Sequence, residues 1–324
     1  MRLSFSLLFA AIISFAVPVL GQETDSLVKK LDSMQKTDAK QDNKPFVDVN
    51  KDEYTSRTNI TFKGYFILLG TDMLQEVRSP FHASRKTWLQ VAGFAAIEGI
   101  VYFVADKPIQ QFSTKFMKNN PGLRNTSQYI TNFGGAYEGY VLAAFGAYGL
   151  IFKSDKVKTT TLLATQAYIT AGAMSEAAKF LTSRQRPNVY DPNNTPPNDF
   201  FYGPAIFNGR SATSGFGSSF PSGHTTAAFA AATVFAYEYK DQILIPSIAY
   251  SAACLVGISR ITQNAHWTTD VLAGAALGYV TGKQVVNNYH RYARLRSGKK
   301  VSLNFHFDLQ YVDGVIMPGM VCKF

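Results

Sequence analysis

Three short segments of this chain place cations, a hydroxyl group and two imidazoles where they could act on a phosphate group. The segments are KFLTSRQRP (179–187), FPSGHTTAAFA (220–230) and SRITQNAHWTTD (259–270). Phosphoryl transfer requires cations for the phosphate charge, a nucleophile in line and a proton for the leaving oxygen. Each segment alone also fits an ordinary structural role, such as a charged helix end or a surface ion pair. Only the three together argue for a site.

The middle segment has the form of a helix start that could bind an anion. Pro221 and Ser222 are typical of a helix N-terminus, and small residues follow them. Backbone N–H groups at such a position point outward unpaired, and the helix dipole adds partial positive charge. Gly223 would let a phosphate approach the backbone, and His224 beside it could act as an acid or a base.

The two flanking segments supply charges at helical spacing. Lys179 and Arg186 are seven residues apart, so one continuous helix would place both on the same face until Pro187 stops it. His266 and Asp270 are four residues apart, and on a helix the carboxylate could bind one imidazole nitrogen.

Taken together, the segments resemble the signature of the type 2 phosphatidic acid phosphatase and vanadium haloperoxidase superfamily. That signature reads Lys-x6-Arg-Pro, Pro-Ser-Gly-His and Ser-Arg-x5-His-x3-Asp. It is complete here at Lys179, Arg186, Pro187, Pro221, Ser222, Gly223, His224, Ser259, Arg260, His266 and Asp270. The resemblance covers residues 88–287 and implies a helical bundle.

The resemblance also implies a role for each residue. His266 attacks phosphorus and forms a phosphohistidine, while Asp270 holds the other ring nitrogen so that the attacking nitrogen is unprotonated. His224 protonates the leaving group and then helps water attack the intermediate. The phosphate-binding residues are Lys179, Arg186, Ser222, Gly223 and Arg260. No metal or other cofactor is needed, and His82 and His290 lack neighbours suited to a zinc site.

The leading hypothesis is an exported phosphatase that hydrolyses phosphate monoesters or lipid phosphates. One alternative is a haloperoxidase, because the same pocket can hold vanadate as a cofactor. Another is a non-catalytic envelope protein that docks a partner through its C-terminal hairpin or its basic run. The residues themselves leave open whether the substrate is a phosphorylated lipid or a small phosphomonoester.

Seven apolar segments rich in alanine, leucine and other small residues must position these side chains. They are 67–77, 88–105, 140–152, 159–181, 225–239, 243–259 and 270–286. Most exceed the length of a strand, so we predict an all-α bundle of about six core helices. A bilayer span needs about 20 consecutive apolar residues. Because the segments are shorter or are interrupted by Glu98, Glu176 and Lys179, we expect a soluble or membrane-peripheral bundle rather than a polytopic one.

The chain divides into four regions by composition. Residues 1–21 have the pattern of a signal peptide, which predicts export to the periplasm or cell envelope, with an uncleaved anchor as the alternative. Residues 22–62 form a polar arm, and residues 63–290 form the bundle. Residues 291–324 hold a basic run and then an alternating pattern, in which Asp313-Gly314 predicts the turn of a β-hairpin.

The net charge of +10 does not indicate a nucleic-acid-binding protein, because the basic residues are scattered along the chain. The one dense run, 290–300, is interpreted as a solvated helix end, and contact with anionic phospholipid headgroups is the functional alternative. A positive balance would also steer a phosphorylated substrate toward the protein.

The segment 187–220 is far longer than a usual helix connection, and such loops are commonly functional. Its aromatic side chains, which could close over a pocket, are Tyr190, Phe200, Phe201, Tyr202 and Phe207. The two cysteines, Cys254 and Cys322, are interpreted as free thiols.

Overall fold

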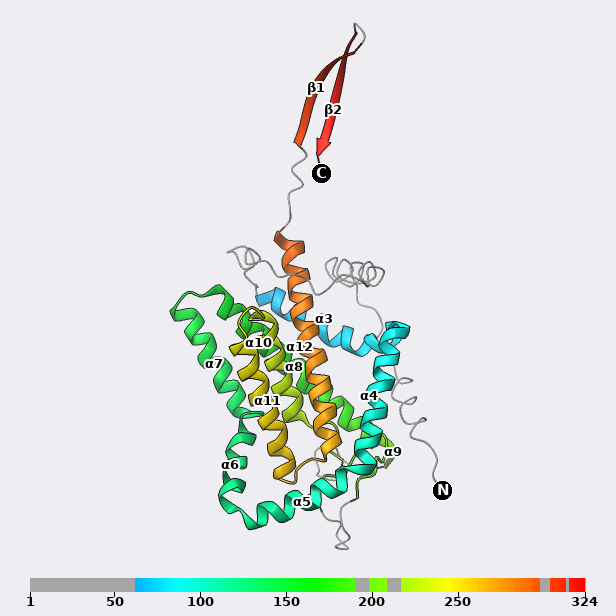
Figure 1. The fold of residues 1–324 in the computed structure, drawn as a ribbon, viewed down its shortest axis with the longest axis vertical. Helices are drawn as coiled ribbons and strands as arrows, with labels where there is room; N and C mark the ends of the chain where they lie inside the picture. Colours follow the sequence, from blue (N-terminus) through cyan, green and yellow to red (C-terminus); the bar gives the residue numbers. More distant parts are fainter. Residues whose placement is uncertain (1–61, 190–197, 209–216, 298–303, 313–314, 324) are drawn as a thin grey trace.

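The computed structural model describes residues 62–189, 198–208 and 217–297, together with the backbone of two C-terminal strands. Helices dominate this part of the chain, in agreement with the predicted helical bundle (Figure 1). They are α3 (Phe62–His82), α4 (Arg85–Val104), α5 (Asp106–Asn119), α6 (Pro121–Asn132), α7 (Ala136–Ile151), α8 (Asp155–Thr182), α9 (Ala205–Asn208), α10 (Gly223–Glu238), α11 (Leu244–Thr262) and α12 (Thr268–Ser297).

Helix α10 lies at the centre of the bundle and packs against α8, α11 and α12. Its contact with α12 is very close because glycines of α12 face it. A Cβ atom on Gly278 would overlap the carbonyl oxygen of Thr226, and one on Gly274 would lie 2.8 Å from the carbonyl oxygen of Ser222. This close approach brings the first turn of α10 against the first turn of α12.

Helices α5 and α6 are polar, and the sequence analysis did not predict them. In Figure 1, α5 runs along the lower end of the bundle and α6 rises from it along one side, and both pack against α11. Their buried contacts are polar: the hydroxyl groups of Ser127 and Thr262 are 2.5 Å apart, and those of Thr131 and Ser259 are 2.6 Å apart. A search for apolar segments misses helices that pack through hydroxyl groups.

The ends of two helices differ from the sequence prediction. Helix α8 ends at Thr182, and Ser183 adopts a left-handed conformation with φ of 43°. The predicted shared helical face of Lys179 and Arg186 is therefore wrong, because Arg186 lies in the loop after the helix. Helix α12 begins only after His266, and it continues to Ser297, past the position at which the bundle was predicted to end.

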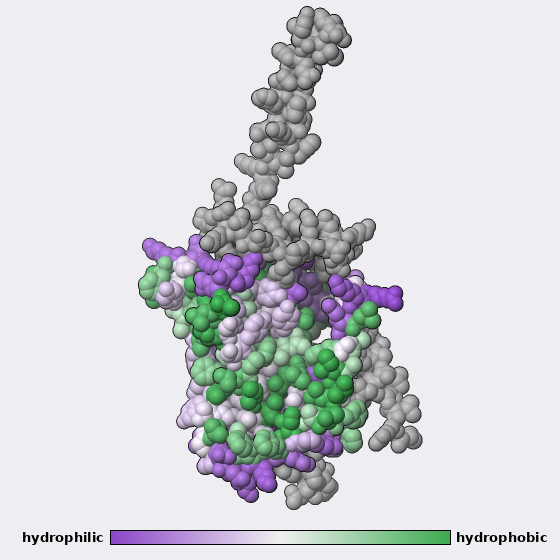
Figure 2. All heavy atoms as spheres, viewed as in Figure 1, coloured by the Kyte–Doolittle hydropathy of each residue, from purple (hydrophilic) through white to green (hydrophobic). Residues whose placement is uncertain are grey.

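Within the part of the chain that the structure describes, two helices are long and apolar enough to cross a membrane, namely α4 and α11. The expectation that core segments fall short of this length is wrong for both. None of the described residues of α4 is buried, and its side chains at Leu89, Ile100 and Phe103 are 66%, 64% and 80% exposed. Figure 2 shows hydrophobic residues in a band across the middle of the bundle, with hydrophilic residues toward both ends.

Near the C-terminus, β1 (Asn304–Val312) and β2 (Val315–Lys323) pair antiparallel, with Asn304 opposite Lys323. The side chains of both strands lie outside the described part, so what the hairpin packs against stays a prediction. Residues 1–61, which include the predicted signal peptide and nearly all of the polar arm, also lie outside it, as do Tyr190 and the side chain of Cys322. Cys254 is an exposed free thiol.

Candidate active site

The three sequence segments meet at one end of the bundle, where α8 and α11 end and α10 and α12 begin (Figure 1). The backbone N–H of Ser222 donates to the carbonyl oxygen of Asp270 at 2.9 Å, which ties the start of α10 to α12. A Cβ atom on Gly223 would lie 3.1 Å from Nζ of Lys179, so the amine lies directly beside the helix start. A side chain at position 223 would therefore press against the Lys179 amine.

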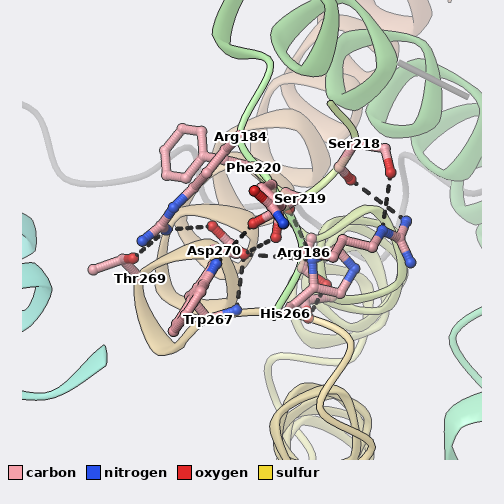
Figure 3. Close-up of polar contacts among 12 residues, drawn as sticks. Arg184, Arg186, Ser218, Ser219, Phe220, His266, Trp267, Thr269 and Asp270 are labelled. Atoms are coloured by element: carbon pink, nitrogen blue, oxygen red, sulfur yellow. Dashed lines mark hydrogen bonds and ion pairs between the residues drawn. The ribbon is translucent and has the colours of Figure 1, made fainter. Parts of the chain in front are cut away.

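His266 is almost fully buried, with 2% of its surface exposed, and its ring is oriented by a backbone carbonyl (Figure 3). Its Nδ1 lies 2.7 Å from the carbonyl oxygen of Ser219 but 3.6 Å from Oδ2 of Asp270. A carbonyl can only accept, so Nδ1 carries the proton and Nε2 is left with its lone pair. The expected hydrogen bond from Nδ1 to Asp270 is not formed, because 3.6 Å is too long for a hydrogen bond.

The protonation state of His266 follows from its burial. Desolvation disfavours the imidazolium ion and lowers the pKa of His266 to about 4, and Arg186 and Arg260 act in the same direction. Asp270 opposes this change but does not overcome it. The side chain is therefore neutral near pH 7, which is the state that a nucleophilic imidazole requires.

Asp270 is fully buried, and donors surround both of its oxygen atoms. Its Oδ2 accepts from Ser219 Oγ at 2.5 Å and from the backbone N–H of Trp267 at 2.8 Å. The second bond caps the start of α12, as an acidic residue in the first turn of a helix commonly does. Its Oδ1 accepts from Nη1 of Arg184 at 2.5 Å.

The three predicted phosphate-binding cations lie around the two histidines. Lys179 pairs with Glu176 at 2.5 Å, and Arg186 donates through Nε to Ser218 Oγ at 2.9 Å. Arg260 is 7% exposed, and among the described residues its Nε has no hydrogen-bond partner. A buried guanidinium with an unused donor is suited to an anion that arrives later.

These cations affect the pKa of His224. Burial, together with the neighbouring groups Arg260, His266, Lys179 and Arg186, lowers the pKa of His224 to about 3. The site is therefore a concentration of positive charge around a neutral imidazole. Ser222, which is fully buried just before the helix, accepts at Oγ from Thr225 Oγ1 at 2.9 Å.

A glycine turn after α6 closes one side of His224, and the sequence analysis did not identify it. A Cβ atom on Gly135 would lie 3.1 Å from Nε2 of His224, and one on Gly134 would lie 3.0 Å from its Cβ. The turn leaves room for the imidazole only because neither residue has a side chain. Two adjacent glycines in the sequence are the signal that could have indicated this.

Arg184 and Asp106 were also missed. Arg184 lies inside the first segment, but the signature does not include it, and Asp106 follows an apolar helix with no nearby motif. In the structure both are fully buried, and Nη2 of Arg184 donates to Oδ2 of Asp106 at 2.6 Å. Phe201 of the long loop lies over this guanidinium, 4.7 Å from ring centroid to Cζ, while Phe200 and Phe207 are exposed.

His290 corrects one prediction, because it does have a suitable neighbour. Its Nε2 lies 2.8 Å from Oε1 of Glu238, at the other end of α10 and α12 from the site. A single carboxylate does not make a zinc site, and among the described residues no group of three metal-binding side chains was found.

Comparison with known proteins supports the grouping of these segments. Residues 160–294 match the model of the PAP2 superfamily, and this range contains every residue of the signature. Lipid A 1-phosphatase of Porphyromonas gingivalis is 52% identical over 66 residues, which is 20% of this chain. Lipid phosphate phosphatase 1 of Arabidopsis thaliana is 33% identical over 128 residues, which is 35% of this chain. The matches span 15% and 39% of the lengths of these relatives.

Two crystal structures are also similar to this chain. One is a transmembrane PAP2 type phosphatidylglycerolphosphate phosphatase from Bacillus subtilis, with 21% identity and a TM-score of 0.42 over 61% of this chain and 92% of that one. The other is Aquifex aeolicus LpxE, with 23% identity and a TM-score of 0.40 over 56% of this chain and 94% of that one.

Proposed function

Because this chain belongs to the PAP2 superfamily through residues 160–294, we propose that it is a phosphatase that hydrolyses a phosphorylated lipid through a phosphohistidine on His266. One observation carries the proposal. The Nδ1 proton of His266 is committed to the Ser219 carbonyl, so Nε2 holds a lone pair in a site ringed by cations. Lipid substrates are favoured because the named relatives are phosphatases of lipid A and of lipid phosphates.

The first step forms a bond between Nε2 of His266 and phosphorus and breaks the bond from phosphorus to the ester oxygen. His224 gives its proton to the departing oxygen, which leaves as an alcohol. In the second step, His224 takes a proton from water, and the resulting hydroxide attacks phosphorus. The N–P bond breaks, inorganic phosphate forms, and both histidines return to their starting states.

Lys179, Arg186 and Arg260 stabilise the charge that collects on the phosphoryl oxygens. Their side chains come from α8, the loop after α8 and α11, and all three act on His224. Fixed cations in a site of low polarity stabilise a transferring phosphoryl group more strongly than they would in water. We expect the reaction to proceed without a metal ion, because these side chains supply the charge that a metal would supply.

We further propose that the protein is membrane-associated through the apolar band of Figure 2. Helices α4 and α11 contribute large exposed apolar side chains to the surface, including Ile100 on α4 and Ile248 on α11. An apolar surface of this extent is costly in water and favourable in hydrocarbon. Export to the periplasm or cell envelope stays a proposal that rests on residues 1–21.

The test is an activity assay on the full chain purified in detergent. Release of inorganic phosphate is measured from phosphatidic acid in mixed micelles and from p-nitrophenyl phosphate in solution, with and without EDTA. We expect the lipid to be preferred, EDTA to have no effect and vanadate to inhibit. His266→Asn should lose at least about 10³-fold in kcat because it removes the nucleophile.

A second measurement addresses the intermediate. A radiolabelled phosphoryl group should remain on the His224→Gln protein in an acid-labile, base-stable form and should be missing from His266→Asn. Activity that survives in His266→Asn would contradict the assigned nucleophile. Vanadate-dependent bromide oxidation without phosphate release would instead favour the haloperoxidase, and neither activity would favour the docking protein.

A further inference from the structure

A buried ionic cluster lies next to His266, where Asp270 connects the histidine to Arg184, and in Figure 3 Arg184 and Arg186 lie on opposite sides of Asp270. Arg184 donates through Nη1 to Oδ1 of Asp270 at 2.5 Å and through Nη2 to Oδ2 of Asp106 at 2.6 Å (Figure 3 shows the first contact). All three side chains are fully buried. One guanidinium thus connects the first residue of α5 to the first turn of α12.

Other groups saturate the cluster and exclude water from it. Thr269 donates to Asp106 twice, through its backbone N–H at 2.9 Å and through Oγ1 at 2.6 Å. Nε of Arg184 donates to the carbonyl oxygen of Asp199 at 3.1 Å. Aromatic rings enclose the guanidinium, namely Tyr102, Phe201 and Trp267. Removing one charge from so dry a cluster leaves the others with little solvent to compensate.

The cluster determines how strongly Asp270 can attract a proton on His266. Arg184 occupies Oδ1, while Ser219 and Trp267 donate to Oδ2, so the negative charge is already compensated. Asp270 therefore remains 3.6 Å from Nδ1 without drawing a second proton onto the ring. A carboxylate at the same place without the arginine would stabilise the imidazolium ion much more strongly.

Charged and titratable groups face both His266 and the cluster behind it. Beyond Asp270, Arg184 and Asp106, those that act on His266 are Arg186 from the loop after α8, Arg260 from α11 and His224 from α10. Lys179 from α8 acts on His224, and Glu98 from α4 faces Asp106, Asp270 and Arg184. Lys107 lies at the outer edge, where it is 60% exposed and pairs with Asp199 at 3.2 Å. Of these groups, Arg184 is the cation in direct contact with Asp270.

We propose that Arg184 and Asp106 are positioning residues that set the proton affinity of His266 through Asp270, and so fix the lowest pH at which the nucleophile is available. Neither residue belongs to the signature, and neither is assigned to the phosphate. The inference rests on the proposed function where activity is the measurement, but it also predicts a property of His266 that can be observed without substrate.

The two residues carry opposite charges, so their variants should act in opposite directions. Arg184→Met leaves the charge of Asp270 uncompensated, which raises the pKa of His266, and the acidic limb of kcat/KM should move up by at least about one pH unit. Asp106→Asn leaves Arg184 less neutralised, so Arg184 compensates Asp270 more fully, the pKa of His266 falls and the limb should move to lower pH. Arg184→Lys keeps the charge but loses the forked geometry, so kcat should fall while the limb stays near that of the wild type.

The same shifts are measured without activity by NMR titration of histidine-labelled full-length protein, with the His266 signal identified by its absence in His266→Asn. Lys107→Met is the matched control, because it removes an exposed cation of the same region and should leave the titration unchanged. A purely structural role would lower kcat in Arg184→Met and Asp106→Asn alike without moving either titration, and that result overturns the inference. A rise of the pKa of His266 in Asp106→Asn would also overturn the inference. This second result is decisive even if Arg184→Met fails to fold.

A wild-type protein that hydrolyses neither substrate would contradict the proposed function. The NMR titrations would still decide the role of Arg184 and Asp106, so the two failures can be told apart.

Discussion

At the scale of single residues, the site combines two neutral histidines, the proposed nucleophile His266 and the proposed acid His224, in a field of fixed positive charge. Burial keeps His266 neutral, with its pKa lowered to about 4, and that suits attack on phosphorus. The same physics leaves His224 unprotonated near neutral pH, because its pKa is lowered to about 3. A donor role therefore requires that the arriving phosphate change the electrostatics around His224.

Because cations hold the pKa of His224 low, we expect anion binding to be coupled to proton uptake by His224. A phosphate dianion neutralises the surrounding cations, so the pKa of His224 rises and, at pH 5.5, the side chain takes up a proton. Calorimetric titration with inorganic phosphate, in buffers of different ionisation enthalpy, measures the number of protons exchanged.

We expect the wild type to take up about one proton more than His224→Gln, because only the wild type has the imidazole that responds to the anion. Equal proton counts in the two proteins would show that His224 does not respond to the phosphate, and would remove it as the proton donor.

At the scale of elements, the site depends on turns and helix ends that hold the side chains in place. The left-handed residue Ser183 ends α8 and turns the chain so that Arg184 and Arg186 leave the helix in different directions. Helix α6 supplies Thr131 beneath Arg260, and the glycine turn that follows it packs against His224. Helix α6 is polar rather than apolar, yet it borders the proposed catalytic side chains.

The glycine turn gives a test at this scale. In Gly135→Ala, the new methyl group would lie 3.1 Å from Nε2 of His224 and would displace the imidazole or obstruct the nitrogen that donates the proton. We expect kcat to fall by at least about tenfold, a loss of about 1.4 kcal/mol in transition-state stabilisation, with little change in KM.

Gly139→Ala is the matched control, one turn further along in α7, because no described atom lies within 4 Å of its added Cβ. It should keep wild-type kcat, and both variants should unfold near the wild-type temperature. Equal activity in the two variants would argue against a tightly confined His224.

At the scale of the whole molecule, the apolar band and the position of the site belong together. The site lies at one end of the bundle, whereas the apolar band of Figure 2 crosses the middle of the bundle. A bilayer around the band would place the phosphate-binding end near the level of lipid headgroups. An interfacial site of this kind gives access to the phosphate of a lipid whose chains remain in the hydrocarbon.

The band predicts where a new charge is harmful. Ile100 is 64% exposed on α4, so Ile100→Arg would be harmless on a soluble protein but would cost about 2.5 to 3.5 kcal/mol within a bilayer. We expect much less of this variant in the membrane fraction of expressing cells. Leu123→Arg is the control, because Leu123 is 50% exposed on the polar helix α6. Equal recovery of both variants would count against burial of α4 in lipid.

The sequence by itself determined the helical class, the main apolar helices and the set of residues that meet at one end of the bundle. It could do so because helix length and apolar content are local properties, and because the spacing within each of the three segments is kept in the chain. Local information does not say where helices end in space. For that reason two predictions were wrong. Lys179 and Arg186 do not share a helical face, and neither do His266 and Asp270, because α8 ends before Arg186 and α12 begins after His266.

Only the tertiary structure decided which groups the proposed catalytic side chains contact. Ser219 orients His266, Arg184 compensates Asp270, and Asp106 compensates Arg184, although these residues are far apart in the chain. The exposure of α4 was also decided there, because an apolar helix has the same sequence pattern whether protein or lipid covers it. Long-range contact and solvent exposure arise when helices pack, and neither is written in the spacing of residues along one segment.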